Sequence, residues 1–576
     1  MVASSETGQA GQLRVPTIGW IVGPRSDFLL VVGTPLLIVP LILLALQQWQ
    51  VAAIYAVVAS LTSVGHHLPG MMRAYGDSAL FARFKLRFIL APIVLATTCL
   101  GLNAWQPSTL KLLLFCWGVW HLFMQAHGLA RIYDGKVGST DSTTVRLDFL
   151  LLGTWFVASV ILADLRFPQL ISLIYDLGAP AIDAAFVMAL REVSVVAVVG
   201  VTSAYVINAV RCTRAGTPPS PVKHVLHASN IGFYVFCNLT VEHILLAVLM
   251  FELFHNIQYL TIVWAFNRRR ADTAPDDAGA FTRFLFRQRW YLVVLYVGLV
   301  LGYGALSVAA KPLDAIVMDG LITGLISTSA LLHFYFDGFI WKLREAQVRQ
   351  NLQAEANVHL ASAPIQHSRV PDGAGHVLKW AVLLVVLFGV SWNVPEHPMS
   401  DAQRYTSLTQ MAPSNGKYQG KLAEIRAHTG DFSGAIEAGR KTLGLLAQDG
   451  LHAAAWETAR GNLVSALMRR SLALLDEGDE ALAATLVHEA VALDGTVPTK
   501  VKKTANSAYA KSELKMAEGH FAVATIIDPR DRDAWIGLAR VQERQDRIPE
   551  SLVSAERASE LAPDVSALLP AAAQTP

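Results

Sequence analysis

Residues 241–270 read VEHILLAVLMFELFHNIQYLTIVWAFNRRR and decide the fold class of this chain. The segment is apolar, long enough to span a lipid bilayer, and ends in three arginines. Glu252 and His255 lie inside it. An ionisable side chain at membrane depth is costly, so its presence there indicates a functional site. Partners for these two side chains have to come from other apolar segments that reach the same depth.

The composition of the whole chain agrees with this first segment. Of 576 residues, 53% are hydrophobic and 16% are charged. These values exclude an ordinary soluble protein and a disordered one. The net charge of +2 does not indicate a nucleic-acid partner, because the basic residues lie between apolar segments, where they act as topology signals. The four cysteines show no C-x-x-C spacing, so neither a disulfide framework nor a thiolate metal site is expected.

Apolar runs that could form membrane-spanning helices recur along the first two thirds of the chain. They cover residues 28–49, 51–64, 88–105, 110–126, 149–163, 193–209, 224–239, 241–266, 290–310, 315–340 and 378–390. Some are shorter than the roughly 20 residues that a spanning helix needs, so the count is about eleven. The pattern predicts an all-α, polytopic membrane helix bundle over residues 28–394, preceded by a cytoplasmic segment 1–27.

Lysine and arginine set the expected orientation. They collect in alternate loops, within residues 73–87, 131–146, 211–223, 268–289 and 342–349. By the positive-inside rule these loops lie in the cytoplasm. With an odd number of helices the N-terminus is then cytoplasmic and the C-terminus extracytoplasmic. We expect an integral protein of a bacterial-type inner (plasma) membrane.

Residues 395–576 are polar and Ala-rich and are predicted to form an extracytoplasmic helical domain. A period of 34 residues separates Pro529 from Pro563 and Ala524 from Ala558. This segment resembles tetratricopeptide repeats, matched at Trp535, Leu538, Ala539, Ala558 and Pro563. Residues 421–493 are expected to form degenerate helical hairpins. The resemblance implies a surface that binds a protein or peptide partner, with a domain that only caps the membrane part as the alternative.

Eight of the 17 histidines are expected to face the cytoplasmic side of the bundle. They are His66, His67, His121, His127, His224, His227, His255 and His333. The helical rise places His121, His255 and His333 roughly 13 to 20 Å inside the basic rim, where they would form an inner tier. The other five lie nearer the interface, and we expect them to form an outer tier that closes over the inner one.

Each inner histidine has a polar partner at helical spacing. The pairs are His121 with Gln125, His255 with Glu252 and Tyr259, and His333 with Asp337. One imidazole nitrogen can bind a metal while the other is oriented by a carboxylate or amide, or the carboxylate can itself be a ligand. Histidine with carboxylate suits iron, zinc or manganese. A single histidine in a membrane helix is more often a neutral hydrogen-bonding residue, but eight on one side favour a metal or haem site.

In number, side and depth these histidines resemble those of histidine-rich integral membrane oxygenases, the group of desaturases, hydroxylases and bacterial carotenoid-cleaving enzymes. The resemblance covers residues 66–341, although the pair at 66–67 stands without an H-x-x-H-H box. It implies non-haem iron, oxygen activation at the metal, and oxidation of an apolar, lipid-like small molecule that enters between helices. It also implies His121, His255 and His333 as first-choice ligands, with the eight histidines as the candidate metal set. Glu252, Asp337 and Tyr259 are the candidate catalytic residues.

Four other functions remain open. A haem- or quinone-linked redox protein would ligate haem through histidines on facing helices. A lipid-linked glycosyltransferase is less favoured, because the first outer loop, residues 47–50, has no acidic residue. A transporter would need paired Gly- or Pro-broken helices in equivalent halves, and none stands out. A non-catalytic membrane scaffold would use the histidines for packing and the repeats for binding a partner.

Overall fold

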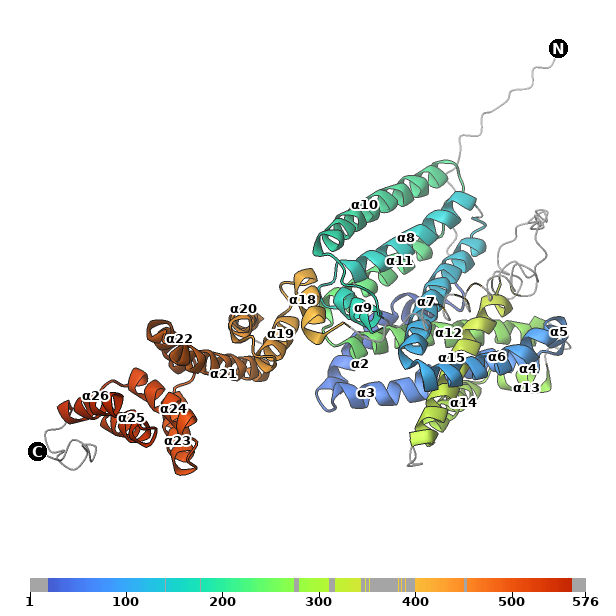
Figure 1. Cartoon of the computed structure of the whole chain (residues 1–576). Coiled ribbons are helices and arrows are strands. Elements are labelled where there is room, and N and C mark those ends of the chain that lie inside the picture. Colours follow the sequence, from blue (N-terminus) through green and yellow to red (C-terminus); the bar gives the residue numbers. More distant parts are fainter. Residues whose placement is uncertain are drawn as a thin grey trace, which may run out of the picture. The chain divides into compact units, whose positions relative to one another are not determined.

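The computed structural model describes residues 19–139, 141–176, 178–273, 279–309, 316–342, 399–449 and 453–561, with isolated positions between 348 and 389. In this part of the chain every regular element is a helix (Figure 1). The chain divides into two compact units, Met1–Pro398 and Met399–Pro576. The all-helical fold predicted from the sequence is confirmed, and the boundary between the units lies close to the predicted position at residues 394 and 395.

Seven helices among the described residues are long and apolar enough to cross a membrane. They are Val51–Gly76, Lys85–Trp105, Pro107–Lys136, Ser142–Ile161, Ala184–Arg214, Ile244–Asp272 and Trp290–Ser307. Their number becomes eight if Pro24–Val32 and Thr34–Leu46, which meet at an angle of 57°, form one bent span. Several apolar, membrane-type helices are thus present, while the predicted count of about eleven is not confirmed.

Three of the predicted apolar runs do not correspond to any of these seven helices. Run 224–239 forms α11 (Pro221–Val235) and a π-helical turn, η3 (Phe236–Thr240). Run 315–340 forms α15 (Ile316–Ile340) with almost the predicted bounds. Run 378–390 lies, but for isolated positions, outside the described residues, as does the N-terminal part of the segment 1–27.

The segment that opened the sequence argument forms α12 (Ile244–Thr273), which starts three residues later than its apolar run. A break separates it from η3, and Arg166 of α9 (Arg166–Tyr175) closes that break. The Arg166 guanidinium donates to the carbonyl oxygens of Cys237, Val241 and Glu242. Carbonyls at the end of a helix have no partner within it, so the buried arginine supplies the missing donors.

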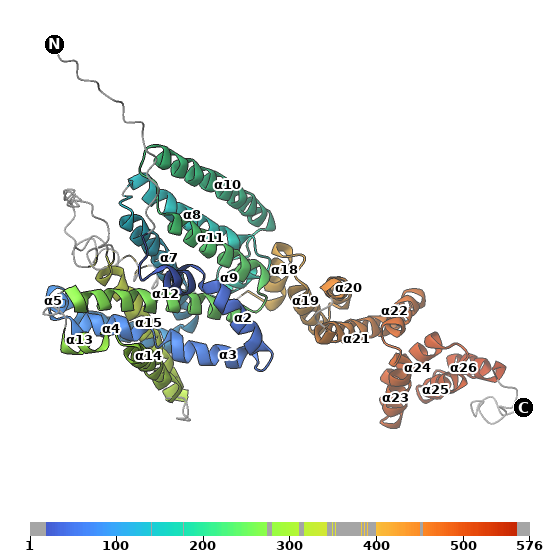
Figure 2. The same cartoon turned by 180° about the vertical axis from the view of Figure 1, so that it is seen from behind.

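The first unit, Met1–Pro398, contains the apolar helices and is called the membrane unit below. Four of its helices position the site: α4 (His67–Gly76), α7 (Pro107–Lys136), α12 and α15. Helix α15 packs against both α4 and α7 (Figures 1 and 2). The chain that leads into α4 passes through a π-helical turn, η2 (Ala59–Ser63), which packs against α14 (Trp290–Ala309). A Cβ atom on Gly304 of α14 would lie 2.3 Å from the carbonyl oxygen of Leu61. The missing side chain therefore lets the two backbones touch, as small residues do between membrane helices.

The second unit is a series of antiparallel helices. They are α18 (Asp401–Met411), α19 (Gly416–His428), α20 (Phe432–Asp449), α21 (Ala453–Glu477), α22 (Glu480–Leu493), α23 (Val497–Ala510), α24 (Leu514–Ile527), α25 (Arg532–Arg544) and α26 (Ile548–Glu560). Consecutive helices pack on one another, and Arg440 of α20 bonds to Glu489 of α22. The assignment of these helices to tetratricopeptide repeats stays a prediction.

Candidate metal centre

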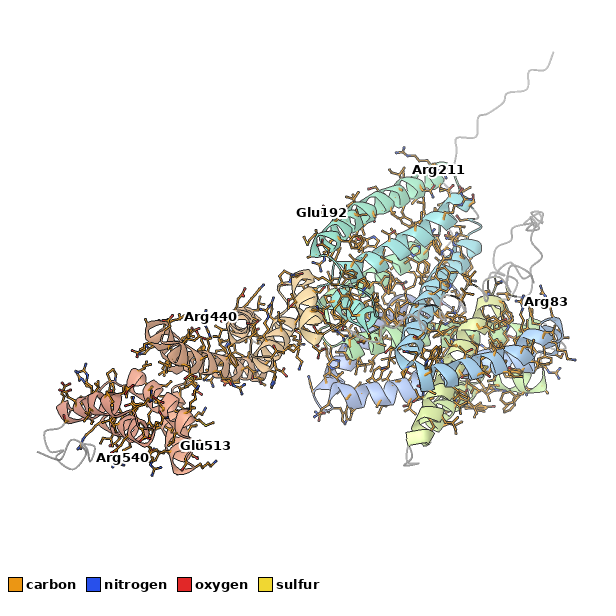
Figure 3. All side chains as sticks on the ribbon, viewed as in Figure 1. Arg83, Glu192, Arg211, Arg440, Glu513 and Arg540 are labelled. Carbon is orange, nitrogen blue, oxygen red and sulfur yellow. The ribbon has the colours of Figure 1, made fainter. Side chains whose placement is uncertain are left out.

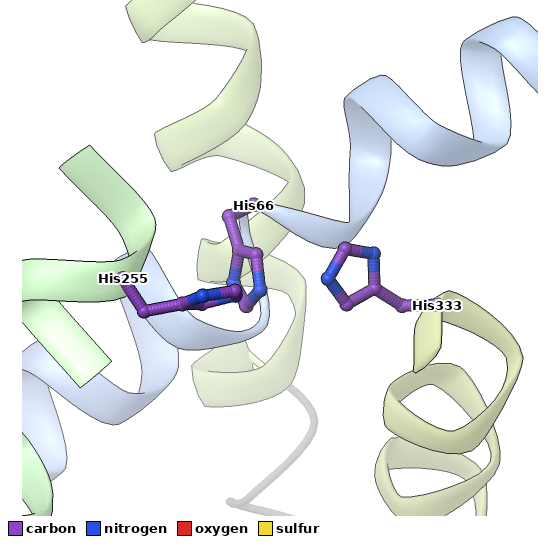
Figure 4. Close-up of side chains that lie close together, drawn as sticks. All are labelled: His66, His255 and His333. Atoms are coloured by element: carbon purple, nitrogen blue, oxygen red, sulfur yellow. The ribbon is translucent and has the colours of Figure 1, made fainter. Parts of the chain in front are cut away.

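Five buried imidazole rings gather in the membrane unit among the described residues: His66, His67, His121, His255 and His333. The ring of His66 lies 4.5 Å from that of His333 and 5.1 Å from that of His255, centroid to centroid. The ring of His121 lies 4.8 Å from that of His255. Figure 4 shows three of these rings converging from separate segments of the chain. Residues far apart in the sequence thus form one histidine cluster.

Two overlapping groups in this cluster have ligand atoms close enough to hold a metal ion. One is His66, His255 and His333, and the other is His121, His333 and Asp337. Within each group the ligand atoms lie within 4.8 Å of one another. The Nε2 atoms of His121 and His255 are 3.2 Å apart. This is a hydrogen-bonding distance, and the two residues belong to different groups. His333, which belongs to both groups, is the centre of the cluster.

Asp337 turns one carboxylate oxygen toward the histidines. Its Oδ1 atom accepts hydrogen bonds from the Tyr259 hydroxyl at 3.1 Å and from Trp341 Nε1 at 3.0 Å. Its Oδ2 atom lies 3.7 Å from His333 Nε2 and 4.0 Å from His121 Nε2. Because two donors hold Oδ1, Oδ2 is the oxygen available to a metal. Helical spacing predicted the pairing with His333. It also placed Tyr259 beside His255, and the two rings stack with centroids 6.1 Å apart, but the Tyr259 hydroxyl bonds to Asp337.

Several ring nitrogens of the cluster have no hydrogen-bond partner among the described residues. These are Nδ1 and Nε2 of His333, Nδ1 of His255 and Nε2 of His66, all of them buried. Buried polar atoms in proteins are nearly always hydrogen-bonded, so each exception needs an explanation. Imidazole nitrogens directed at a metal ion would account for unpaired atoms in this cluster.

Neighbouring polar groups orient two of the rings. His66 Nδ1 lies 3.3 Å from the carbonyl oxygen of Thr62, and His67 Nδ1 lies 2.9 Å from Ser329 Oγ. A hydrogen bond at one nitrogen fixes the tautomer and leaves the other nitrogen as the ligand. For His66 the nitrogen left over is the unpaired Nε2. Thr62 and Ser329 were not predicted, because Ser and Thr in apolar helices are common and carry no ligand-like signal.

Gly70 of α4 permits the close packing around Asp337. A Cβ atom at this position would lie 3.0 Å from the Tyr259 hydroxyl and 3.4 Å from Asp337 Oδ1. Any side chain would therefore press on the pair that orients the carboxylate. The sequence gives no hint of this role, because it arises only where α4 meets two other helices.

Arg73 supports the carboxylate of Asp337 indirectly, through Trp341. Its guanidinium carbon lies 4.1 Å from the ring centroids of Phe266 and Trp341, so the cation is sandwiched between two aromatic faces. The indole of Trp341 is thereby held where its N–H reaches Asp337. Asp77, at the end of α4, forms an ion pair with Arg270 of α12.

The predicted outer tier does not form as one layer. His66 and His67 belong to the cluster itself, whereas His127, His224 and His227 lie apart from it. His227 Nε2 is 3.1 Å from Asp148 Oδ1, and His224 Nδ1 is 2.5 Å from the Tyr205 hydroxyl. The ring of His127 packs edge-on against Phe149. Depth estimated from a constant helical rise failed for His66 and His67, because η2 and a turn interrupt the helix before them.

Glu252 and Gln125 also differ from expectation. Glu252 belongs to neither metal group, although it lies one turn from His255. Gln125 donates its side-chain N–H to the backbone oxygen of His255 at 3.1 Å and to Gln258 Oε1 at 3.3 Å. It therefore ties α7 to α12 rather than orienting the His121 ring beside it.

A cavity of about 660 Å³ adjoins the cluster. His121, Tyr259 and Asp337 form part of its wall, and most of the remaining wall is apolar or aromatic. An apolar small molecule in this cavity would therefore contact residues of the candidate metal site. Membrane proteins that act on such molecules need an apolar cavity of this size with a few polar groups.

Comparison with known proteins identifies no family. No family model matches the sequence, and no curated protein matches it significantly. The chemistry of the site has to be inferred from its own residues.

The two donors to Asp337 provide a test of the site. We expect Trp341→Phe and Tyr259→Phe each to weaken metal binding about 10- to 100-fold, as the loss of hydrogen bonds to a metal ligand does. Tyr259→Phe removes only the hydroxyl that holds Oδ1. Trp341→Phe keeps an aromatic side chain but replaces the indole with a smaller phenyl ring and removes its N–H, which is why the control is also a Trp→Phe change. Titration of the purified variants with Fe²⁺ or Zn²⁺ measures the effect. Trp264→Phe, on α12 but outside the cluster, is the control; unchanged affinity in both site variants would show that Asp337 is not a ligand.

Proposed function

We propose that this protein is a metal-dependent membrane oxidoreductase of the oxygenase type. Its metal site is formed by the histidine cluster together with Asp337. The main support for the proposal is that buried ligand atoms of both candidate metal groups lie around His333. The two ring nitrogens of His333 have no hydrogen-bond partner among the described residues. A buried histidine group without a bound ion would leave these nitrogens unsatisfied at a cost in free energy.

The donor set favours iron, with zinc or manganese as alternatives. Imidazole and carboxylate suit these ions, and neither metal group includes a cysteine. When bound, iron would supply one-electron and oxygen chemistry that no side chain can perform. Direct ligation of an ion is favoured over haem, because the rings of His66, His255 and His333 pack on one another with centroids 4.5–6.4 Å apart and leave no room for a macrocycle between them.

The residues around the site have separate roles in this proposal. The cluster and Asp337 hold the metal, and Tyr259 and Trp341 fix the carboxylate. Burial of the cluster excludes water from the reaction, which protects reactive species and strengthens electrostatic interactions. The adjoining cavity holds the apolar substrate against His121. Glu252 is not among the metal ligands of this proposal, because it belongs to neither metal group.

The proposal also includes the topology and the partner of the second unit. Basic residues at the C-terminal ends of α7, α12 and α15 favour a cytoplasmic location for these ends. An odd number of crossings, such as the predicted eleven, then places Met399–Pro576 outside the cytoplasm. The 34-residue offset between the starts of α24 and α26 supports a tetratricopeptide-like array that binds a protein or peptide.

Oxygen incorporation tests the reaction. Iron-loaded protein in nanodiscs made from bacterial lipid extract is supplied with a reductant and ¹⁸O₂, and the lipids are analysed by mass spectrometry. We expect ¹⁸O in a lipid product, or a product two hydrogens lighter, with the wild type and not with His121→Ala. A product that forms equally well with His121→Ala, or no product from any lipid, would contradict the proposal. So would a haem absorption band in the active protein.

A further inference from the structure

The cavity beside the cluster is elongated along α7. Trp117, His121, Met124, Gly128 and Ile132 lie in its wall. Their spacing of three or four residues places them on one face of the helix. From Trp117 to Ile132 this face extends about 22 Å at a rise of about 1.5 Å per residue. The cavity can therefore hold an extended chain rather than only a compact molecule.

The histidines lie toward one end of this cavity. His121 is only one turn from Trp117, whereas the wall continues beyond it to Ile132, near the basic end of α7. On α12 the wall starts at Tyr259 and continues toward the three arginines. On α15 it extends from Phe334 to Phe339, and Trp341 and Lys342 follow beyond the end of that helix. The C-terminal parts of these helices lie together, because Ile132 of α7, Phe266 of α12 and Trp341 just after α15 pack in one core cluster. A molecule that enters at the basic end reaches the histidines with its far end.

The wall carries two cations and one carboxylate. Arg87 and Lys342 are its cations, and Asp337, which faces the histidines, is its carboxylate. The Arg87 guanidinium lies 5.2 Å from the ring centroids of Phe84 and Phe339. Among the described residues Arg87 is paired with no carboxylate. The cavity thus offers positive charge to a ligand beside a mostly apolar wall.

Part of the cavity wall reaches the outer surface of the helices. Trp120 and Met124 line it, and their side chains are 52% and 38% exposed. Large apolar side chains exposed on a spanning helix face the acyl chains of the bilayer. An amphiphile can therefore slide in sideways with its head group at the level of the basic rim.

We propose that this cavity binds an acidic amphiphile. Its carboxylate or phosphate head group lies at Arg87 and Lys342, and its single apolar chain follows α7 to His121 and Asp337. The proposal rests on the function proposed above for the event at the histidine end, but binding itself requires no metal. Guanidinium and ammonium groups bind carboxylate and phosphate through charge-assisted hydrogen bonds, which select such molecules over neutral lipids.

Equilibrium binding of radiolabelled dodecanoate tests the proposal. Metal-free protein is placed in nanodiscs of neutral phosphatidylcholine, and dodecanol serves as the neutral probe of equal chain length. We expect Arg87→Gln to bind dodecanoate about tenfold more weakly than the wild type. Dodecanol should bind both proteins alike and more weakly than dodecanoate binds the wild type. Equal dodecanol binding also shows that the variant has kept the cavity intact.

Arg83→Gln is the matched control. Arg83, near Arg87 and labelled in Figure 3, also places its guanidinium over Phe84, at 5.0 Å, but does not line the cavity. Dodecanoate binding by Arg83→Gln should equal that of the wild type. Unchanged binding by Arg87→Gln, equal weakening by Arg83→Gln, or dodecanol binding as tight as dodecanoate binding would each overturn the proposal.

A displacement experiment distinguishes two sources of the acidic head group. If phosphatidylglycerol in the nanodisc displaces dodecanoate, the ligand is a membrane phospholipid; if it does not, the ligand is a single-chain acid.

Failure of this inference and failure of the proposed function remain distinguishable. A protein that holds metal but prefers no acidic amphiphile contradicts only the inference. A protein that binds dodecanoate through Arg87 but holds no metal contradicts only the function.

Discussion

His333→Ala is expected to abolish stoichiometric metal binding. His333 is the one residue common to both candidate metal groups, and its Nε2 atom is 3.7 Å from Asp337 Oδ2. Removing a hydrogen bond to a ligand weakens metal affinity about 10- to 100-fold, so removing the ligand that both groups share should weaken it at least about 100-fold. Metal analysis of the purified variant, together with a titration with Fe²⁺, measures the loss.

His243→Ala is the control for this change. His243 precedes α12 at the end opposite the basic residues and is exposed. Its replacement removes the same side chain from the membrane unit without touching the cluster, so the metal content should match that of the wild type. His224→Ala, which removes the ring bonded to Tyr205, should also retain the metal. Equal metal content in His333→Ala and His243→Ala would show that the cluster is not the metal site.

Asp148→Ala is expected to destabilise the membrane unit by about 3–5 kcal/mol. Asp148 is fully buried and accepts hydrogen bonds from Arg131, Lys223 and His227. The Lys223 side chain is 0% exposed and also bonds to Asp134, at 2.8 Å. Without Asp148, the buried ammonium group of Lys223 loses one of the two carboxylates that it contacts and keeps Asp134. An uncompensated charge in such surroundings is far more costly than the loss of a surface pair.

Titration with SDS in mixed micelles measures the free energy of unfolding for this prediction. Asp141→Ala is the control, because Asp141 lies just before the same helix, α8 (Ser142–Ile161), and accepts from the backbone N–H of Thr144. Loss of that helix cap should cost about 1 kcal/mol. Replacing both partners, as Asp148→Asn with Lys223→Met, should recover much of the loss. If Asp148→Ala unfolds no more easily than Asp141→Ala, the buried network does not stabilise the unit.

Much of the fold could be predicted from the sequence because membrane helices have a strong compositional signal. The apolar run that contains Glu252 and His255 forms α12, and run 315–340 forms α15. Pairs on one helix were predictable for the same reason. Asp337 lies within reach of His333 because side chains four residues apart lie on one helix face.

Contacts between helices could not be predicted in this way. Helical spacing assigns Tyr259 to His255, yet its hydroxyl bonds to Asp337, 78 residues away. Gln125 likewise bonds to α12 rather than to His121. Which helix faces meet depends on packing, and here it depends on small residues such as Gly70 that leave no trace in a hydropathy pattern.

Depth within the membrane was predictable only for continuous helices. His66 and His67 were expected near the interface, but η2 and the turn before α4 bring both into the cluster. His227 was expected to join the outer tier, but it bonds to Asp148, 79 residues away. A histidine count therefore indicated a site, and the structure was needed to separate the five clustered rings from the three that lie elsewhere.

The metal content of the wild-type protein tests the central claim most directly. The protein is purified in detergent from cells grown without added metal, and iron, zinc and manganese are measured per polypeptide chain. The cluster around His333 and Asp337 predicts at least one tightly bound ion per chain, with iron the most abundant. A chain that holds none of the three metals, and takes up none when they are supplied, would contradict the claim.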